Sequence, residues 1–497
     1  MEKRYLCADA GTTHLKLALR DESGRTLGRY ATRLESRVAE DGCSEMDMDA
    51  LWEAFRGGVD ALGRESAENL AALGNLSGIG ICAQGDGLWA IGADGRPVGP
   101  AILWNDTRAS DLMPEVERLL APRYAESRTA AQFSGANAVL LRFLKMNDPE
   151  RYRRIASVLH CKDWLNYRLT GRIGTERTDA GTSVFSRTAE TYDETLLRLL
   201  GIPEAAAWLP PVLASDAVIG RTIEGALPHV SAGVPVIAGG LDLAAAAFGL
   251  GVRAAGQTLC ILGTTFCVLQ VVDDATVAEW PKIGSILYSL VPGRSIRLLA
   301  SLNGSAVLEW GRRIMGGPGI EDAEREASAA PAGCGGAAFV PFLYGERAPF
   351  RDPGACGAFV GLRAHHDRGC MLRAMYEGLA AAMRLCAESL PTYPRRVVVT
   401  GGASNSDLLC RILADTLEAT VERVRVSEPG IEGIFSLLAG RRTERESDAE
   451  RFRFAPGNAG VPRDAIDRLR AHSRRSDASG RGGDTRTVHI PERTEGY

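Results

Sequence analysis

The chain has 497 residues, of which 45% are hydrophobic and 24% charged, as in ordinary globular proteins. This length exceeds what one hydrophobic core usually holds, so two large domains are expected. The formal net charge of −4 gives no support for a nucleic-acid or membrane-surface partner, and no apolar run is long enough to span a bilayer.

The first predicted element is a three-stranded meander over residues 4–35. Its first two strands, Tyr5–Ala8 and Leu15–Leu19, are joined by a turn that contains Gly11-Thr12-Thr13. A strand–turn–strand unit offers backbone N–H groups and hydroxyls to an anion at its tip. The acid before the turn, Asp9, suits Mg²⁺; the alternative is an aspartate that only forms the turn.

A helical period over residues 47–73 is followed by a short buried strand, Ile79–Ala83. The strand ends in the unusual loop Gln84-Gly85-Asp86-Gly87. A short carboxylate between glycines can accept hydrogen bonds from two hydroxyl groups, although aspartate is also common in tight turns. Residues 110–200 are predicted to be mostly helical, with a polar, Thr-rich interruption near 172–186.

The second half begins with a strand, Val236–Ala238, that leads through two glycines to Asp242 and a predicted helix, Leu243–Leu250. A second Gly-Thr-Thr, Gly263–Thr265, again lies between two β-like runs. Two such tips, one in each half, could hold a nucleotide's phosphates from both sides; the alternative is a chance repeat of common turn residues. Only the first copy carries an acid, which indicates one Mg²⁺ site on the N-terminal side.

The remaining elements alternate between helix and strand, which predicts the α/β class. Helices are expected over residues 303–315, 367–390 and 406–417, and a strand over Arg396–Thr400 that leads directly into Gly401–Asn405. The eleven cysteines are scattered singly, without a Cys-x-x-Cys pair. Together with the absence of a signal-peptide pattern, this favours a reducing, cytoplasmic compartment.

The composition changes after about residue 440. Residues 441–497 contain thirteen arginines and one leucine, Leu469, and they have no sustained apolar period. We expect an atypical, disordered tail. The alternative is a basic binding arm, which the interspersed acids disfavour.

The motifs resemble, in their order, those of the FGGY family of carbohydrate kinases, and the match extends from residue 4 to about 440. The matching segments are Asp9–Thr13 with Lys16, Trp104–Arg108, Lys162–Leu165 with Arg168–Gly171, Gly239–Asp242, Gly263–Thr265, Gly345–Pro349 with Tyr376–Gly378, and Gly401–Ser404. The resemblance implies two actin-like (ribonuclease H-like) domains that flank a nucleotide and sugar cleft. We place them at residues 1–245 and 246–440, before the tail at 441–497.

The resemblance also implies ATP and Mg²⁺ as cofactors and a role for each site residue. Asp242 would be the general base, although it could instead cap the following helix, and Asp9 with Asp242 would hold the metal. Lys16 would reach the outer phosphates, or else be a solvated strand residue. The implied ATP-binding residues are Gly11, Thr12, Thr13, Lys16, Gly263, Thr264, Thr265, Asn303, Gly401, Gly402, Ala403 and Asn405, with Gly304 near the nucleotide.

The acceptor is implied to be a small sugar or polyol. The loop around Asp86 looks like that of the erythritol kinase branch, so erythritol is favoured, with L-xylulose or another pentulose as the alternative. Trp104 would contact the sugar or fill the core, and Lys162–Trp164 would order the fold. The implied acceptor-binding residues are Gln84, Asp86, Gly87, Trp104, Asp106, Arg108, Asp179 and Asp242, with Thr178 beside them.

The sequence departs from the family pattern near residue 430. The family's Gly/Ala-rich closing helix should follow Glu428, but Pro429-Gly430-Ile431-Glu432 and then the Arg-rich tail stand there, so we expect this helix to be lost. That loss is the main argument for an impaired nucleotide-binding scaffold as the alternative function; plain ATP hydrolysis is a third. A homodimer is common among relatives and is the expected assembly if the chain is not monomeric.

Overall fold

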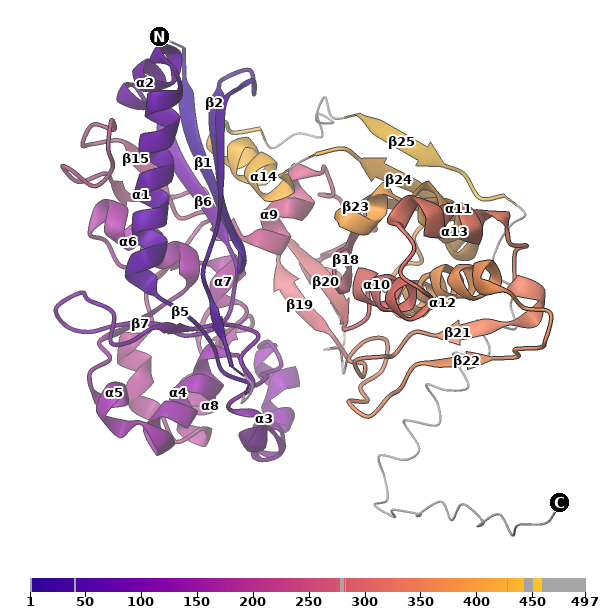
Figure 1. Ribbon diagram of the computed structural model, residues 1–497. Helices are drawn as coiled ribbons and strands as arrows, with labels where there is room; N and C mark the ends of the chain where they lie inside the picture. The colour runs from indigo at the N-terminus through magenta and orange to yellow at the C-terminus, as the bar shows by residue number, and fades with distance from the viewer. Residues whose placement is uncertain are drawn as a thin grey trace.

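The computed structural model describes residues 2–39, 42–277, 281, 283–426, 428–441 and 450–457. Two mixed β-sheets, one in each half of the chain, form its framework, and helices cover their faces (Figure 1). The predicted α/β class is therefore confirmed. Among the helices of these residues, none combines the length and the apolar character that crossing a membrane requires.

The first sheet is built around the predicted N-terminal meander. Strand order is β14-β15-β6-β1-β2-β3, with β16 also paired to β6. Strands β1 and β2 are antiparallel, and β6 lies parallel to β1 on its other side. The strands are β1 (Arg4–Ala10), β2 (His14–Asp21), β3 (Thr26–Arg33), β6 (Gly78–Ala83), β14 (Val218–Arg221), β15 (Pro235–Ile237) and β16 (Gly240–Leu241).

Helix α1 (Met48–Glu65) packs across β2 and β3 because its apolar residues recur every three or four positions. Its N-cap, Asp47, accepts hydrogen bonds from the backbone N–H groups of Asp49 and Ala50. The other helices of this half are α2 (Ala67–Gly74), α3 (Met113–Ser127), α4 (Asn137–Asn147), α5 (Pro149–Arg153), α6 (Cys161–Thr170), α7 (Arg177–Ala180), α8 (Glu194–Leu199) and the 3₁₀ turns η1 (Ser110–Leu112) and η2 (Pro203–Trp208).

Short strands complete the N-terminal half. β5 pairs with both β4 and β8, and the other pairs are β7 with β9, β10 with β13, and β11 with β12. Their bounds are β4 (Arg37–Val38), β5 (Ser44–Met46), β7 (Trp89–Ile91), β8 (Ala101–Ile102), β9 (Ser157–Leu159), β10 (Thr175–Glu176), β11 (Phe185–Ser186), β12 (Thr191–Tyr192) and β13 (Val212–Leu213).

The second sheet repeats the plan of the first around the second Gly-Thr-Thr. Strand order is β19-β20-β18-β17-β23-β24-β25, with β17 antiparallel to β18 and parallel to β23. Its strands are β17 (Thr258–Leu262), β18 (Phe266–Asp273), β19 (Ser285–Tyr288), β20 (Arg294–Ser301), β23 (Arg396–Thr400), β24 (Thr420–Val424) and β25 (Arg451–Phe454). Both halves thus present a hairpin tip beside a parallel strand, as the repeat predicted.

Helices also surround the second sheet. The long α12 packs between α11, α13 and the small β21–β22 pair, and its buried face joins the core under β17 and β23. The bounds are α10 (Ser305–Ile314), α11 (Ile320–Ala329), α12 (Arg368–Glu388), α13 (Asp407–Leu417), β21 (Ala338–Val340), β22 (Ala358–Val360), and the 3₁₀ turns η3 (Asp274–Thr276), η4 (Cys334–Gly336) and η5 (Gly402–Asn405).

The closing helix expected to be lost is present, so that expectation is wrong. Helix α14 (Pro429–Leu438) lies beside α9 (Asp242–Gly249), and both lie between the two sheets (Figure 1). The two backbones cross so closely that a Cβ on Gly433 would lie 2.0 Å from the Ala245 carbonyl oxygen. Proline and glycines give this helix a weak intrinsic propensity, and burial against α9 supplies the stability that propensity lacks.

The expected tail also differs where it is described. Arg451–Phe454 forms β25, antiparallel to β24, instead of a disordered segment. Arg451 and Arg453 lie near the buried Glu422 carboxylate, and Arg423 stacks on Phe452, so the arginines there pair with acids and rings. The rest of the predicted tail, 442–449 and 458–497, lies outside the described residues.

Candidate active site

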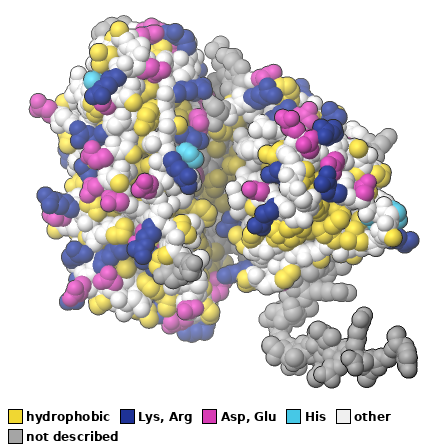
Figure 2. All heavy atoms as spheres, viewed as in Figure 1, with side chains coloured by type: hydrophobic (Ala, Val, Ile, Leu, Met, Phe, Trp, Pro, Cys, Tyr) yellow, Lys and Arg dark blue, Asp and Glu magenta, His cyan; other side chains and the backbone are white. Residues whose placement is uncertain are grey.

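A cavity of about 1320 Å³ opens between the two halves of the molecule. Figure 2 shows the groove that separates the two lobes. Predicted site residues from both halves line it: Asp9, Gly11, Lys16, Asp242, Gly401, Gly402 and Asn405. Segments that are almost 400 residues apart in the chain, such as Asp9 and Asn405, therefore meet in one space.

The two hairpin tips are held by different means. In the first, the Gly11 N–H donates to the His14 carbonyl (3.0 Å) and closes the turn. In the second, the N–H groups of Ser305 and Ala306 at the start of α10 donate to the carbonyls of Gly263 and Thr264 (2.8 and 3.2 Å). Thr12, Thr13 and the second tip are not among the described residues that line the cavity.

Asp9 and Asp242 bring two carboxyl groups to the cavity from β1 and the start of α9. Burial and then the nearby Asp9 raise the pKa of Asp242 to about 8, and burial raises the pKa of Asp9 to about 6. Each carboxylate would be stabilised by a cation between them, and oxygen ligands are those that Mg²⁺ prefers. These two residues therefore fit a metal site.

The backbone that leads to Asp242 requires a glycine at position 239. Gly239 has φ 88°, and a Cβ there would lie 2.0 Å from the Ile81 carbonyl oxygen. The N-cap of α9 is Leu241, and Asp242 is the first helical residue. One carboxylate oxygen, Oδ1, accepts a hydrogen bond from the N–H of the next residue, Leu243 (2.6 Å), and α9 has no side-chain cap, so the capping alternative is not supported. The other oxygen is not engaged by this bond.

Lys16 lies opposite Asp9 across the β1–β2 hairpin, and it lines the cavity. Its Nζ is 2.6 Å from Glu428 Oε2, at the residue before α14. The side chain is one-third exposed, so it is neither simply solvated nor free. To reach a phosphate it would have to exchange this partner.

The loop Gln84–Gly87 and Trp104 are tied to the first hairpin tip by a chain of hydrogen bonds. Trp104 Nε1 donates to Thr12 Oγ1 (3.0 Å), and the Thr12 hydroxyl donates to Gln84 Oε1 (3.0 Å). Trp104 is 37% exposed, so it does not fill the core. The hydroxyl of Thr12, predicted to contact phosphate, instead links the two predicted binding loops.

Asp86 stands in a strained and partly buried position. Its φ is 55°, and its Oδ1 is buried without a hydrogen-bond partner within the described part of the chain. Burial raises the pKa of Asp86 to about 7, against the opposing effect of His160. A carboxylate held this way is typical of a binding site and not of a simple turn.

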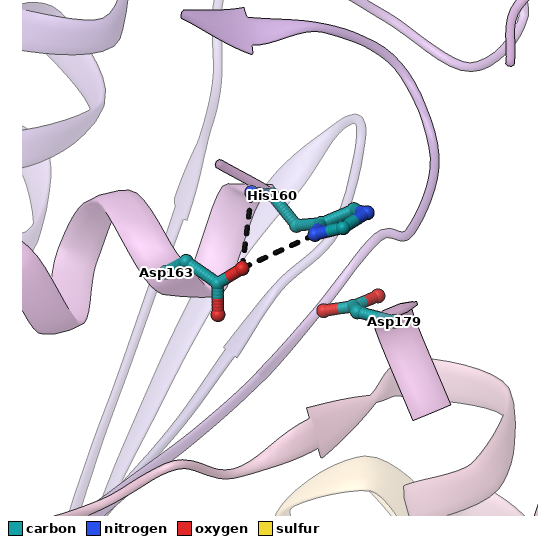
Figure 3. Close-up of side chains that lie close together, drawn as sticks. All are labelled: His160, Asp163 and Asp179. Atoms are coloured by element: carbon teal, nitrogen blue, oxygen red, sulfur yellow. Dashed lines mark hydrogen bonds and ion pairs between the residues drawn. The ribbon is translucent and has the colours of Figure 1, made fainter. Parts of the chain in front are cut away.

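A buried cluster lies next to this loop (Figure 3). Lys162 Nζ is 2.6 Å from Asp163 Oδ1 and 2.8 Å from Asp179 Oδ2, and His160 Nδ1 is 3.1 Å from Asp163 Oδ2. Burial lowers the pKa of His160, but Asp179 and Asp163 more than offset this, so the net shift is upward. The expectation that Lys162–Trp164 orders the fold agrees with this pairing.

The predicted adenosine loop follows β23 through a left-handed glycine. Gly401 has φ 95°, and a Cβ there would lie 2.6 Å from the Leu262 carbonyl oxygen, so the loop packs against the strand before the second tip. Arg423 Nη1 donates to the carbonyls of Ser404 and Asn405 (3.1 and 3.2 Å) and thereby fixes the loop. Ala403 is not among the cavity-lining residues described.

Two predicted acceptor-binding residues serve the fold instead. The Asp106 carboxylate is fully buried, accepts from the Ser44 N–H (2.6 Å), and pairs with Arg108. Arg108 also pairs with Glu45 at 2.8 Å. Because both side chains are satisfied by the protein, the expected contact of Asp106 and Arg108 with an acceptor is not supported.

Asn303 also has structural partners. It is fully buried, its Nδ2 donates to the Gly345 carbonyl (2.8 Å), and its Oδ1 accepts from the Tyr344 N–H (3.3 Å). The side chain therefore braces the Gly345–Pro349 segment beside the second tip. Gly304 supports that tip through its backbone, since a Cβ there would lie 2.4 Å from the Thr265 carbonyl carbon.

Two residues at the site were not predicted from the sequence. His160 is the N-cap of α6 and precedes Lys162, and Glu428 pairs with Lys16. A lone histidine before a helix gives no local signal of a site. For Glu428, the only signal was its position at the start of the expected closing helix.

Comparison with known proteins agrees with this geometry. Residues 4–249 match the N-terminal domain model, and residues 293–440 the C-terminal domain model, of the FGGY family of carbohydrate kinases. A probable L-xylulose kinase of Pasteurella multocida is 30% identical over 465 residues, which cover 89% of this chain and 92% of that protein. An erythritol kinase of Brucella abortus is 26% identical over 461 residues, which cover 87% of this chain and 86% of that protein.

Comparison with solved structures agrees with the sequence comparison. The crystal structure of a "xyloylose kinase" from Brucella ovis superimposes with a TM-score of 0.83 at 25% sequence identity, and it covers 96% of this chain and 98% of that one. The match extends over both sheets and the cavity between them.

Proposed function

The chain belongs to the FGGY family of carbohydrate kinases, and on that premise we propose that it transfers the γ-phosphate of ATP to a hydroxyl group of a short polyol or ketose. The observation that carries the proposal is the meeting of Asp9 and Asp242 with Gly11 and Gly401 in one cavity. A phosphoryl-transfer site needs positioned charges from both sides of a cleft more than it needs covalent chemistry.

In this proposal Asp242 is the general base. Its pKa, raised by burial and by Asp9 to about 8, makes the carboxylate a good proton acceptor near neutral pH. Oδ1 is held by the Leu243 N–H, so the other oxygen would take the proton of the attacking hydroxyl.

Asp9 and Asp242 would hold Mg²⁺, which when bound neutralises charge on the transferred phosphate. The N–H groups and hydroxyls of the two tips would orient the phosphates, and Gly401, Gly402 and Asn405 would receive the adenosine. The two halves that carry these groups would exclude water when the cleft closes, which limits wasteful ATP hydrolysis.

The acceptor is proposed from the loop that contains Asp86. Its buried carboxylate between glycines suits the hydroxyls of a short chain. Erythritol and L-xylulose are the two leading acceptors: the loop pattern favours the first, and the 30% identity with an L-xylulose kinase favours the second.

The impaired scaffold loses its main argument because α14 is present and packs against α9. The test is ADP release with Mg-ATP across erythritol, other short polyols, glycerol, L- and D-xylulose and ribulose. Strong release with one acceptor is expected. Release that ignores the acceptor would identify an ATPase, and ATP binding without release across the panel would contradict the proposal.

A further inference from the structure

We propose that His160, with Asp86 and Asp179, forms a second acceptor-binding group in which the His160 Nε2–H donates a hydrogen bond to an acceptor oxygen. This inference rests on the proposed function, because it concerns the same acceptor. It assigns a binding role to a residue that neither the motifs nor the family resemblance singled out.

The histidine ring is held in one orientation. Its Nδ1 and its backbone N–H both lie 3.1 Å from Asp163 Oδ2. Figure 3 shows the other ring nitrogen pointing away from Asp163. Because Nδ1 faces a carboxylate it carries a proton, so Nε2 is also a donor in the imidazolium form, which Asp179 and Asp163 stabilise by raising the pKa of His160. This Nε2 is buried, and among the described residues it has no hydrogen-bond partner.

Two more side-chain atoms of the proposed group lack partners. Asp86 Oδ1 and Asp179 Oδ1 are buried and likewise unpartnered within the described ranges. Buried polar atoms without partners are costly, and they are rare in native proteins unless a ligand or water pairs with them. One donor and two acceptors without partners are therefore a strong indication of a missing polar ligand.

The residues that carry these atoms lie close together. One side-chain ligand atom from each of His160, Asp163 and Asp179 lies within 4.8 Å of the others. A Cβ on Gly85 would lie 3.2 Å from Asp179 Oδ1, so this carboxylate contacts the backbone of the Asp86 loop. His160 also acts on the pKa of Asp86, second only to burial, so the two side chains are near each other.

The cluster extends from the proposed catalytic carboxyl. Asp9, Asp179 and Asp86 all raise the pKa of Asp242 in addition to burial, with Asp9 the strongest of the three. Asp9, Asp179 and Asp86 therefore all lie near Asp242, and the last two belong to the cluster. A chain of several carbons could place one hydroxyl at Asp242 and a more distant oxygen at His160.

A metal ion is a poor occupant of this cluster, although the spacing of His160, Asp163 and Asp179 would allow one. The Lys162 ammonium already lies within 2.8 Å of both carboxylates, and a second cation would be repelled by it. An uncharged polyol or ketose adds no charge. One of its hydroxyl or keto oxygens can accept from His160, and its hydroxyl groups can donate to Asp86 and Asp179.

The test compares two substitutions by calorimetric binding of erythritol and L-xylulose without ATP, and by kinetics with Mg-ATP. His160→Asn keeps only the nitrogen that faces Asp163, whereas His160→Gln can restore a donor at the Nε2 position. We expect at least tenfold weaker acceptor binding and a tenfold higher acceptor KM for His160→Asn, an ATP KM within twofold, and substantial recovery in His160→Gln.

The matched control is His229→Asn, because His229 is a partly exposed histidine that pairs with Asp60 at 2.8 Å outside the cavity. Equal effects of the Asn and Gln variants, a parallel rise of the ATP KM, or unchanged acceptor binding would overturn the inference. If the wild type binds an acceptor but does not release ADP, the proposed function fails while this assignment survives on the binding data alone. If neither acceptor binds the wild type, the assignment fails too.

Discussion

Buried charges occur in two settings in the N-terminal half of this protein. In the paired set, Arg108 lies between Asp106 and Glu45, and Lys162 pairs with Asp163. The open set consists of Asp86, Asp179, His160 and Asp242. The first three have buried atoms without partners in the described structure, although Asp179 Oδ2 also pairs with Lys162 and His160 Nδ1 with Asp163. Burial raises the pKa of Asp242. The paired set stabilises the fold, whereas the open set costs stability that a bound ligand would recover.

The largest expected effect is at Asp242. Asp242→Asn removes the proton acceptor but keeps a side-chain oxygen that can accept from the Leu243 N–H. We expect kcat to fall by roughly 10³-fold with ATP affinity nearly unchanged, measured by ADP release and by calorimetric ATP binding.

The control for this variant is Asp47→Asn, at the N-cap of α1 outside the cavity, which should leave kcat unchanged. Turnover of Asp242→Asn within tenfold of the wild type would remove Asp242 from the mechanism.

The paired set is tested at Lys162, which is fully buried. Lys162→Met leaves Asp163 and Asp179 without their cation, and breaking a buried pair in this way costs about 3–5 kcal/mol. Urea unfolding should show this loss. Lys145→Met, which breaks an ion pair with Glu204 that is about 40% exposed on both sides, should cost less than about 1 kcal/mol. Similar losses for both lysines would remove the distinction between the two sets.

The sequence alone could not distinguish the paired set from the open set. Asp86 and Asp106 are both aspartates beside glycine or turn residues, and both were predicted to bind the acceptor. What distinguishes them is the Ser44 N–H and the Arg108–Glu45 pair, which reach Asp106 only after the strands β5 and β8 have paired. Such long-range partners leave no local pattern.

Local patterns predicted the hairpins well, because a turn between two strands is encoded within about a dozen residues. They failed at α14, where Gly430 and Gly433 lower helix propensity but allow close packing on Cys82 and Ala245. Family motifs pointed to the proposed general base, Asp242, but not to His160, whose proposed role depends on Asp86 and Asp179 lying near it.

The destabilising effect of the open set should appear in the pH dependence of the free energy of unfolding. The pKa of Asp86 is about 7 in the folded protein, above its ordinary value of 3.8. The folded state therefore retains a proton that the unfolded state releases, and stability falls as the pH rises from about 4 through 7. Asp86→Asn removes this loss, so we expect it to be about 1–3 kcal/mol more stable than the wild type at pH 8.

The gain in stability of Asp86→Asn over the wild type should shrink towards pH 4, as measured by urea unfolding at a series of pH values. The same variant should raise the acceptor KM. A gain that does not depend on pH would show that folding does not raise the pKa of Asp86. An unchanged acceptor KM would remove Asp86 from the pocket.

The smallest expected effect concerns Trp104, which is partly exposed and belongs to neither set. Trp104→Phe keeps the ring but loses the hydrogen bond from Nε1 to Thr12 Oγ1, which is worth about 1 kcal/mol. We expect the acceptor KM to rise about fivefold with kcat nearly unchanged. Thr12→Val should have a similar effect, and the double variant should be little worse than either, because both changes remove the same link.

Trp208→Phe is the control, since Trp208 packs on Tyr152 away from the cavity. If the two changes instead add fully, Trp104 and Thr12 act independently, and the first hairpin tip is not coupled to the acceptor loop. If they overlap as expected, the polar chain through Thr12 and Gln84 transmits acceptor binding to the loop that would hold the phosphates.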